Sequence, residues 1–153
     1  EAEAEAEAQG MHAAAAEADE VLADALASVF LDTSANVVVT RAERPFAIVH
    51  VNQAWCELCA MEAHEVVGKA SLNCIQGPLT DAKVVAEAME RLVDTGDPVD
   101  MRLVNYKKGA RPFANHVFVE ALRDKGGVPR YFVGRLNEEA PPADLQLPAP
   151  RVR

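Results

Sequence analysis

The stretch "LVNYKKGARPFAN", residues 103–115, decides the fold, because it contains the end of one predicted strand and the start of the next. Alternate residues of a strand point to the same face. Asn105 accordingly shares its face with Leu103, and Asn115 lies among apolar residues on the corresponding face of the next strand. A buried carboxamide without a partner costs about 1–3 kcal/mol, so each must bond either to a neighbouring loop or to a bound polar molecule, such as a flat heteroaromatic ligand.

The other predicted strands are short β-branched or aromatic runs bounded by turn residues. Five strands are predicted in all, at residues 36–40, 46–51, 99–106, 112–124 and 130–137. Helical spacing of apolar residues predicts helical segments over 52–68 and 80–96, between the second and third strands. Parallel α/β folds need a crossover between successive strands, so this order predicts an α+β fold instead. We expect a five-stranded antiparallel sheet with helices on one face.

The N-terminal flank differs from this core in composition. Residues 1–10, "EAEAEAEAQG", alternate glutamate with alanine and are interpreted as an added spacer before Met11, with a native acidic arm as the alternative. Residues 11–31 are predicted to form a flanking helix. Its apolar stripe consists of Leu22, Leu26, Val29 and Phe30. Such a stripe packs on its own sheet or pairs with a second copy, so a homodimer through this helix or through a sheet face is expected as one outcome.

The predicted core spans residues 32–138, and residues 139–153 form a proline-rich tail without periodicity. A formal charge of −9 argues against a nucleic-acid partner, which normally requires a clustered basic surface. No apolar run reaches the 18 or more residues of a membrane span. An odd count of three cysteines does not suggest a disulfide framework, so a reducing, cytoplasmic location is expected.

Three runs carry a family resemblance: residues 103–115, "ALRDKGGVPRYFVG" at 121–134 and "GKASLNCIQGPLTD" at 68–81. Together with "NVVVT" upstream, they resemble the motifs of light-oxygen-voltage (LOV) domains of the Per-Arnt-Sim (PAS) class, over about residues 29–137. The resemblance implies the PAS/LOV fold and a flavin, FMN or riboflavin, between the sheet and the helices. It also implies blue-light signalling through a cysteine adduct to the flavin ring.

The same match of motif positions implies a set of binding residues. Asn105 and Asn115 would bond the pyrimidine edge of the flavin, and Gln76 would bond its ribityl chain or ring. The residues that would border the pocket or sandwich the ring are Asn36, Thr40, Ile75, Val117, Val119 and Phe132.

Two departures from the family concern its photochemistry. The family cysteine lies four residues before the glutamine that corresponds to Gln76, where this chain has Leu72, and counting from the preceding glycine reaches Ser71. Cys74, two residues before Gln76, is expected to point away from the ring as a small buried residue, with adduct formation as the alternative. The family's glutamine on the last strand is replaced by Leu136, which cannot exchange hydrogen bonds with a flavin.

A third departure concerns the phosphate of FMN. The two arginines that grip it in the family correspond to Asn73 and Met89, and the nearest basic residue in the sequence, Arg91, is expected to face elsewhere. Phosphate affinity should therefore fall, which leaves FMN, riboflavin and no flavin as alternatives for this pocket.

From the sequence we predict a flavin-binding, LOV-like blue-light or redox sensory domain that is not an enzyme. Its photochemistry would be atypical, with Trp55, Tyr106 or Tyr131 as electron donors, and it would signal through its flanking helix. The alternative is a flavin-free PAS module for protein interaction or dimerisation.

A further alternative rests on "WCELC", residues 55–59, which resembles the redox site of thioredoxin-like proteins. A dithiol oxidoreductase would use Cys56 and Cys59. Against it, thioredoxin-like folds need a parallel βαβ core, and Glu57-Leu58 is not their usual dipeptide between the cysteines. A zinc site is weaker still, because one C-x-x-C pair supplies two of four ligands.

Overall fold

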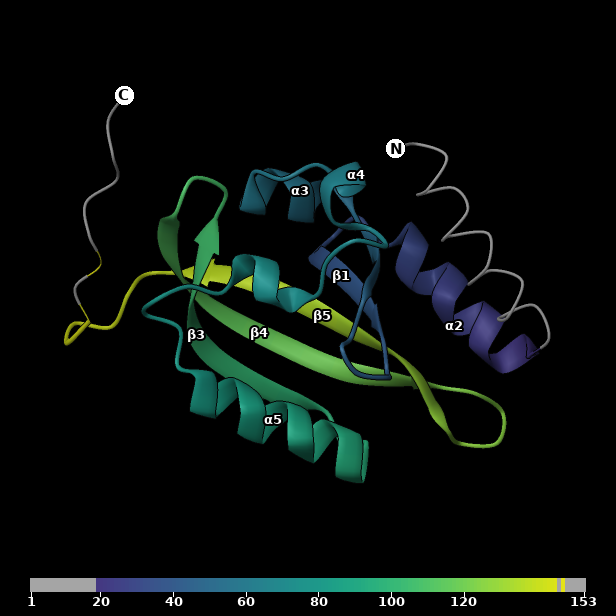
Figure 1. The fold of residues 1–153 in the computed structure, drawn as a ribbon. Helices are drawn as coiled ribbons and strands as arrows, with labels where there is room; N and C mark the ends of the chain where they lie inside the picture. Colours follow the sequence, from purple (N-terminus) through teal and green to yellow (C-terminus); the bar gives the residue numbers. More distant parts are fainter. Residues whose placement is uncertain (1–18, 146, 148–153) are drawn as a thin grey trace.

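The protein is described from a computed structural model that covers residues 19–145 and 147. Its core is one antiparallel five-stranded sheet in the order β2-β1-β5-β4-β3 (Figure 1). The strands are β1 (Asn36–Arg41), β2 (Ile48–Val51), β3 (Val99–Lys107), β4 (Arg111–Arg123) and β5 (Pro129–Glu139). This confirms the predicted α+β fold with a five-stranded antiparallel sheet.

The chain between β2 and β3 forms the helices that cover the inner face of the sheet. They are α3 (Gln53–Cys59), α4 (Ala63–Val66), the 3₁₀ helix η1 (Leu72–Ile75) and α5 (Ala82–Thr95). Helix α5 begins where Asp81 accepts hydrogen bonds from backbone N–H groups of the first turn, and it ends at Gly96 with a φ of +70°. A left-handed residue at this position is readily supplied by glycine, so the sequence determines both ends of α5.

Helix α3 begins at Asn52, whose side chain bonds four backbone groups. Its Oδ1 accepts from the N–H groups of Val37 (3.0 Å) and Trp55 (2.9 Å). Its Nδ2 donates to the carbonyls of Asp32 (3.2 Å) and Ala35 (2.7 Å). One carboxamide thus joins the start of α3 to the segment that precedes β1.

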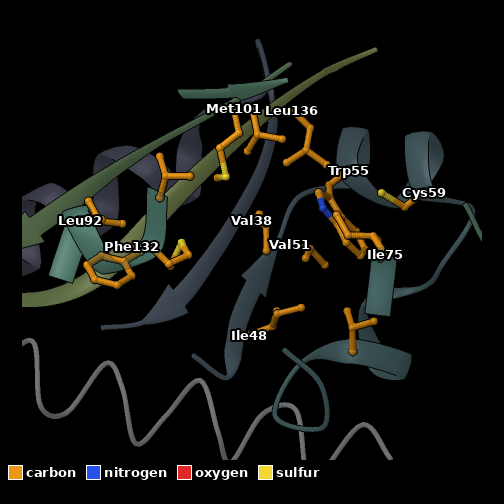
Figure 2. Close-up of a cluster of buried hydrophobic side chains, with 14 of the residues drawn as sticks. Val38, Ile48, Val51, Trp55, Cys59, Ile75, Leu92, Met101, Phe132 and Leu136 are labelled. Carbon is orange, nitrogen blue, oxygen red and sulfur yellow. The ribbon is translucent and has the colours of Figure 1, made fainter. Parts of the chain in front are cut away.

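The strand register places both predicted asparagines on the inner face. Leu103 pairs with Asn115, and Asn105 pairs with Phe113 across β3 and β4. The predicted alternation is confirmed by burial, because Asn105 and Asn115 are 2% and 1% exposed. Figure 2 shows part of the core on this face, with Trp55, Cys59 and Ile75 at one end and Phe132 at the other.

Helix α2 (Glu20–Leu31) packs on the opposite face of the sheet (Figure 1). Its stripe residues Leu22, Leu26 and Val29 are buried in a second apolar cluster. The sheet contributes Val37, Val39, Val49, Tyr131 and Val133 to that cluster. The stripe thus packs on its own sheet, the first of the two expected arrangements, whereas Phe30 is 38% exposed and contacts the His50 ring at 4.5 Å between centroids.

The structure refines several predicted boundaries. Strand β2 begins at Ile48 instead of residue 46, because Phe46 has a φ of +62°, which turns the chain away from extended geometry. Strand β5 continues to Glu139. The spacer 1–10, residues 11–18 of the predicted flanking helix, and residues 146 and 148–153 of the tail lie outside the described residues. In residues 19–145, no helix combines the length and apolar character of a membrane span.

Candidate functional site

A cavity of about 420 Å³ lies between the inner face of the sheet and the helices that cover it. It is lined by Val38, Arg44, Pro45, Phe46, Ser71, Leu72, Asn73, Ile75, Gln76, Ala82, Val85, Ala86, Met89, Met101, Leu103, Asn105, Val117, Gly134 and Leu136. Strands β1, β3, β4 and β5 form one apolar wall, and η1 and α5 form the opposite one. Small-molecule sites have volumes of about 300–1,000 Å³, so this cavity suits one flat, mostly apolar ligand.

The floor of the cavity is kept open by Gly134 on β5. A Cβ atom at this position would lie 3.0 Å from Cγ1 of Val38 and 4.0 Å from Cδ1 of Leu136. A side chain would therefore occupy the space above β5 that the glycine leaves free. This supports the fit of a planar ring against the sheet.

The two asparagines form a hydrogen-bonded chain on this wall. Nδ2 of Asn105 donates to the carbonyl of Ile75 (3.1 Å), and Oδ1 of Asn105 accepts from Nδ2 of Asn115 (2.9 Å). Oδ1 of Asn115 accepts from the backbone N–H of Asn137 (3.0 Å). Each side chain thus bonds to protein groups, yet an amide carries two N–H donors and each uses one of them here. Asn105 lines the cavity, and Asn115 lies behind it.

Gln76 follows η1 and also lines the cavity. The segment after it is fixed on β3. The backbone N–H of Gly77 donates to Oγ1 of Thr80 (3.0 Å), and that hydroxyl donates to the carbonyl of Val104. A Cβ at Gly77 would lie 2.4 Å from the ring of Tyr106, so glycine is required for this close packing. These contacts hold Gln76 at the edge of the cavity.

The remaining sequence-predicted residues divide into two groups. Those that line the cavity with Asn105 and Gln76 are Asn73, Ile75, Val117 and Leu136. Those that do not line it are Asn36, Thr40, Asn115, Val119 and Phe132. The amide of Asn36 donates to the carbonyl of Leu136 (2.9 Å), and the hydroxyl of Thr40 donates to the carbonyl of Arg41 (3.0 Å). Binding roles for both groups remain predictions.

Sequence reasoning missed the connection between β1 and β2. Arg44, Pro45 and Phe46 line the cavity, and the Phe46 ring lies 5.7 Å from the ring of Phe132 between centroids. The proline signalled only a turn, and no periodicity indicates which way a turn faces. Of the cavity-facing residues of α5 it considered only Met89 and missed Ala82, Val85 and Ala86, although the spacing of these four is a helical signal.

The cavity-lining residues include no cysteine, whereas Ser71, Leu72 and Asn73 all line it. Cys74 is half-buried and packs against the inner core. Burial raises the pKa of its thiol to about 11. The thiol of Cys74 is therefore placed outside the cavity and held in its protonated form near neutral pH.

The arrangement of Cys56 and Cys59 does not suit dithiol chemistry. Cys59 is fully buried, and this burial raises the pKa of its thiol to about 12, whereas a reactive cysteine needs an accessible thiolate. The antiparallel sheet order also lacks the parallel βαβ core of thioredoxin-like folds. Within the described part of the chain, no group of three His, Cys, Asp or Glu residues is arranged to hold a metal ion.

The chain belongs to the PAS domain family, because residues 36–137 match the family model described as "PAS domain". The matched segment begins with β1 and ends in β5, so it contains the sheet, the covering helices and the cavity.

Among curated proteins, the chain is 34% identical over 88 residues to a blue-light-activated histidine kinase of Brucella anthropi, covering 56% of this chain and 17% of that protein. It is 35% identical over 116 residues to phototropin-2 of Oryza sativa subsp. japonica, covering 74% of this chain and 12% of that protein. The chain thus spans less than a fifth of either relative.

A structure solved in work on a flavin analogue and the mechanism of a light-oxygen-voltage domain is also similar, with 28% identity and a TM-score of 0.65. That match covers 78% of this chain and 84% of the other. This PAS domain is therefore similar in sequence to blue-light receptors and in structure to a light-oxygen-voltage domain.

Proposed function

We propose that the cavity binds a flavin and that the domain is a blue-light or redox sensor. The observation that carries this proposal is the carboxamide of Asn105, which is 2% exposed and faces an apolar cavity of about 420 Å³ with one N–H donor unused. Gln76 adds a second amide at the same cavity. Amide groups match the alternating donors and acceptors of a pyrimidine edge, and the apolar walls match the faces of a fused ring. The sequence and structural relatives of the LOV type support the same choice of ligand.

A bound flavin would supply absorption of blue light and a ring that accepts electrons. The residues of this chain would bind and orient it. Asn105 would hold the polar edge, with Asn115 fixing the orientation of Asn105 through the bond of 2.9 Å. Leu136, which is 1% exposed, would exclude water from β5 without offering a hydrogen bond.

We infer that sensing in this domain does not use a cysteine adduct. In the described part of the chain the three cysteines all lie outside the cavity, and the Cys74 thiol has its pKa raised by burial. Electron transfer from a buried aromatic residue is the alternative route. Of the three predicted donors, Trp55 is fully buried in the core cluster on the cavity side of the sheet. Tyr131 belongs instead to the α2 cluster, and the hydroxyl of Tyr106 accepts a hydrogen bond from the backbone of Leu79.

Strand β5 is the proposed route from the cavity to α2. It lies between β1 and β4. Its inner residues Gly134 and Leu136 line the cavity, and its outer residues Tyr131 and Val133 pack against α2. A shift of β5 that follows a change in the ligand's charge would therefore reach α2 through a single layer of backbone.

The test is reconstitution of the purified chain with FMN and with riboflavin, followed by fluorescence titration and illumination. Flavin should bind the wild-type chain. Asn105→Ala should lower the affinity for both flavins by about tenfold or more, as expected for loss of a buried hydrogen bond of roughly 1.5 kcal/mol. Asn137→Ala is the matched control, because this asparagine is exposed on the same sheet. If neither FMN nor riboflavin binds the wild-type chain, the proposal is refuted.

A second candidate function, a flavin-free interaction module, is favoured by the hydrogen bonds that already join Asn105 and Asn115 to protein groups. In that case the cavity would stay empty of flavin. Size-exclusion chromatography with light scattering would then show an oligomer that neither flavin nor light alters.

A further inference from the structure

Arg44 is the one charged residue among the described residues that line the cavity. It lies in the connection between β1 and β2, at an exposed position on the rim. Its guanidinium carbon is 5.2 Å from the centroid of the Phe46 ring, which also lines the cavity. A cation stacked on an aromatic ring at this distance is attracted to the ring face, so Phe46 orients the guanidinium at the opening.

The charges next to Arg44 leave it available. Arg41 pairs with Glu43 at 3.5 Å, so the acidic residue adjacent to Arg44 is already paired with a different arginine. Within residues 19–145, no carboxylate lies within ion-pair distance of the Arg44 guanidinium. A positive charge at the opening of an apolar cavity, without an acidic partner among residues 19–145, favours an anionic group on the ligand.

The helical wall of the cavity, formed by η1 and α5, offers no such charge. Asn73 on η1 and Met89 on α5 both line the cavity, and both are uncharged. Asp81 caps the start of α5 with a carboxylate, which does not favour an anion there. Among the described residues, only the β1–β2 connection therefore places a cation on the cavity.

We propose that Arg44 binds the phosphate at the anionic end of FMN. The cavity then binds FMN more tightly than riboflavin, and the phosphate lies at the β1–β2 connection. This inference rests on the proposed flavin function. A guanidinium presents parallel N–H donors that match two phosphate oxygens, which gives both affinity and direction. Arg44 then determines the preference for FMN over riboflavin. It lies in the β1–β2 connection, whose orientation no sequence periodicity predicts.

The experiment compares the affinities of FMN and riboflavin for the wild-type chain, Arg44→Gln and Arg44→Lys by fluorescence titration. Wild type should bind FMN at least about tenfold more tightly than riboflavin, as expected for a charge-assisted hydrogen bond. Arg44→Gln should lower the affinity for FMN alone, so that the two affinities become nearly equal. Arg44→Lys should retain part of the preference for FMN. Arg91→Gln, which changes an exposed arginine of α5 outside the cavity lining, is the control and should leave the ratio unchanged.

Raising the salt concentration should weaken FMN binding and leave riboflavin binding nearly constant, because exposed charges are screened. Equal affinity of wild type for the two flavins would overturn the role of Arg44 while leaving flavin binding intact. An equal loss for both flavins in Arg44→Gln would also overturn it, since that result indicates packing on Phe46. Absence of binding by either flavin would instead refute the proposed function, and the inference with it.

Discussion

The side-chain amide of Asn115 donates a hydrogen bond of 2.9 Å to Oδ1 of Asn105, so an asparagine behind the cavity wall orients the one that lines it. The chain continues to the backbone of Asn137 on β5 and to the carbonyl of Ile75 on η1. Three strands and one helix therefore contribute to the position of a single cavity-facing amide.

Asn115→Ala should reduce stability and weaken flavin binding, although Asn115 does not line the cavity. The substitution leaves Oδ1 of Asn105 and the N–H of Asn137 without their buried partner, at a cost of about 1–3 kcal/mol in the free energy of unfolding. Urea unfolding measures the loss of stability, and titration with FMN measures the loss of affinity. If unfolding changes and flavin affinity does not, Asn115 supports only the sheet.

Gly134→Val should abolish flavin binding and lower the free energy of unfolding by about 1–3 kcal/mol, because its side chain enters a space where even a Cβ lies 3.0 Å from Val38. Adding Val38→Ala should restore part of both losses. Gly126→Ala in the β4–β5 turn is the control, since its Cβ would meet only the end of Asp124 at 3.3 Å. Unchanged flavin binding in Gly134→Val would show that the ring does not lie on β5.

Leu72→Cys should introduce light-dependent bleaching of bound flavin that recovers in the dark, because residue 72 lines the cavity and would bring a thiol to it. Cys74→Ser should leave the response of the wild-type domain to light unchanged, because Cys74 lies outside the cavity lining. Absorption spectra before and after blue light measure both variants. Bleaching in wild type that disappears in Cys74→Ser would contradict the absence of a cysteine adduct.

The stability of the α2 side should depend on pH through His50. Burial lowers the pKa of the His50 imidazole, and its Nε2 is buried without a hydrogen-bond partner in the described residues. The unfolded chain therefore binds the proton more readily, near its ordinary pKa of about 6.5, and stability is lost as the pH falls through that value. Thermal unfolding from pH 7.5 to 5 measures this effect, which His50→Gln should diminish. An identical pH dependence in both proteins would show that other groups cause it.

The sequence predicted which face of the sheet each residue lies on, but not where along its strand the cavity begins and ends. Period two correctly placed Asn105, Asn115 and Val119 on the inner face, because alternation depends only on the local backbone. Only Asn105 of these three lines the cavity. Position along a strand relative to the cavity depends on where η1 and α5 cross it, and that is set by tertiary packing.

Two other features could not be predicted for the same kind of reason. The apolar stripe of α2 has one pattern whether it meets its own sheet or a second chain, so its packing on Val37 and Val133 had to come from the structure. The inward turn at Phe46 depends on a φ of +62°, which a phenylalanine rarely adopts and no sequence pattern signals. The rim at Arg44 was missed with it.

The four bonds of the Asn52 side chain also determine what kind of motion the domain permits. They join the end of α2, the first residues of β1 and the start of α3, so a rotation of α2 would be transmitted to α3 and to the sheet together.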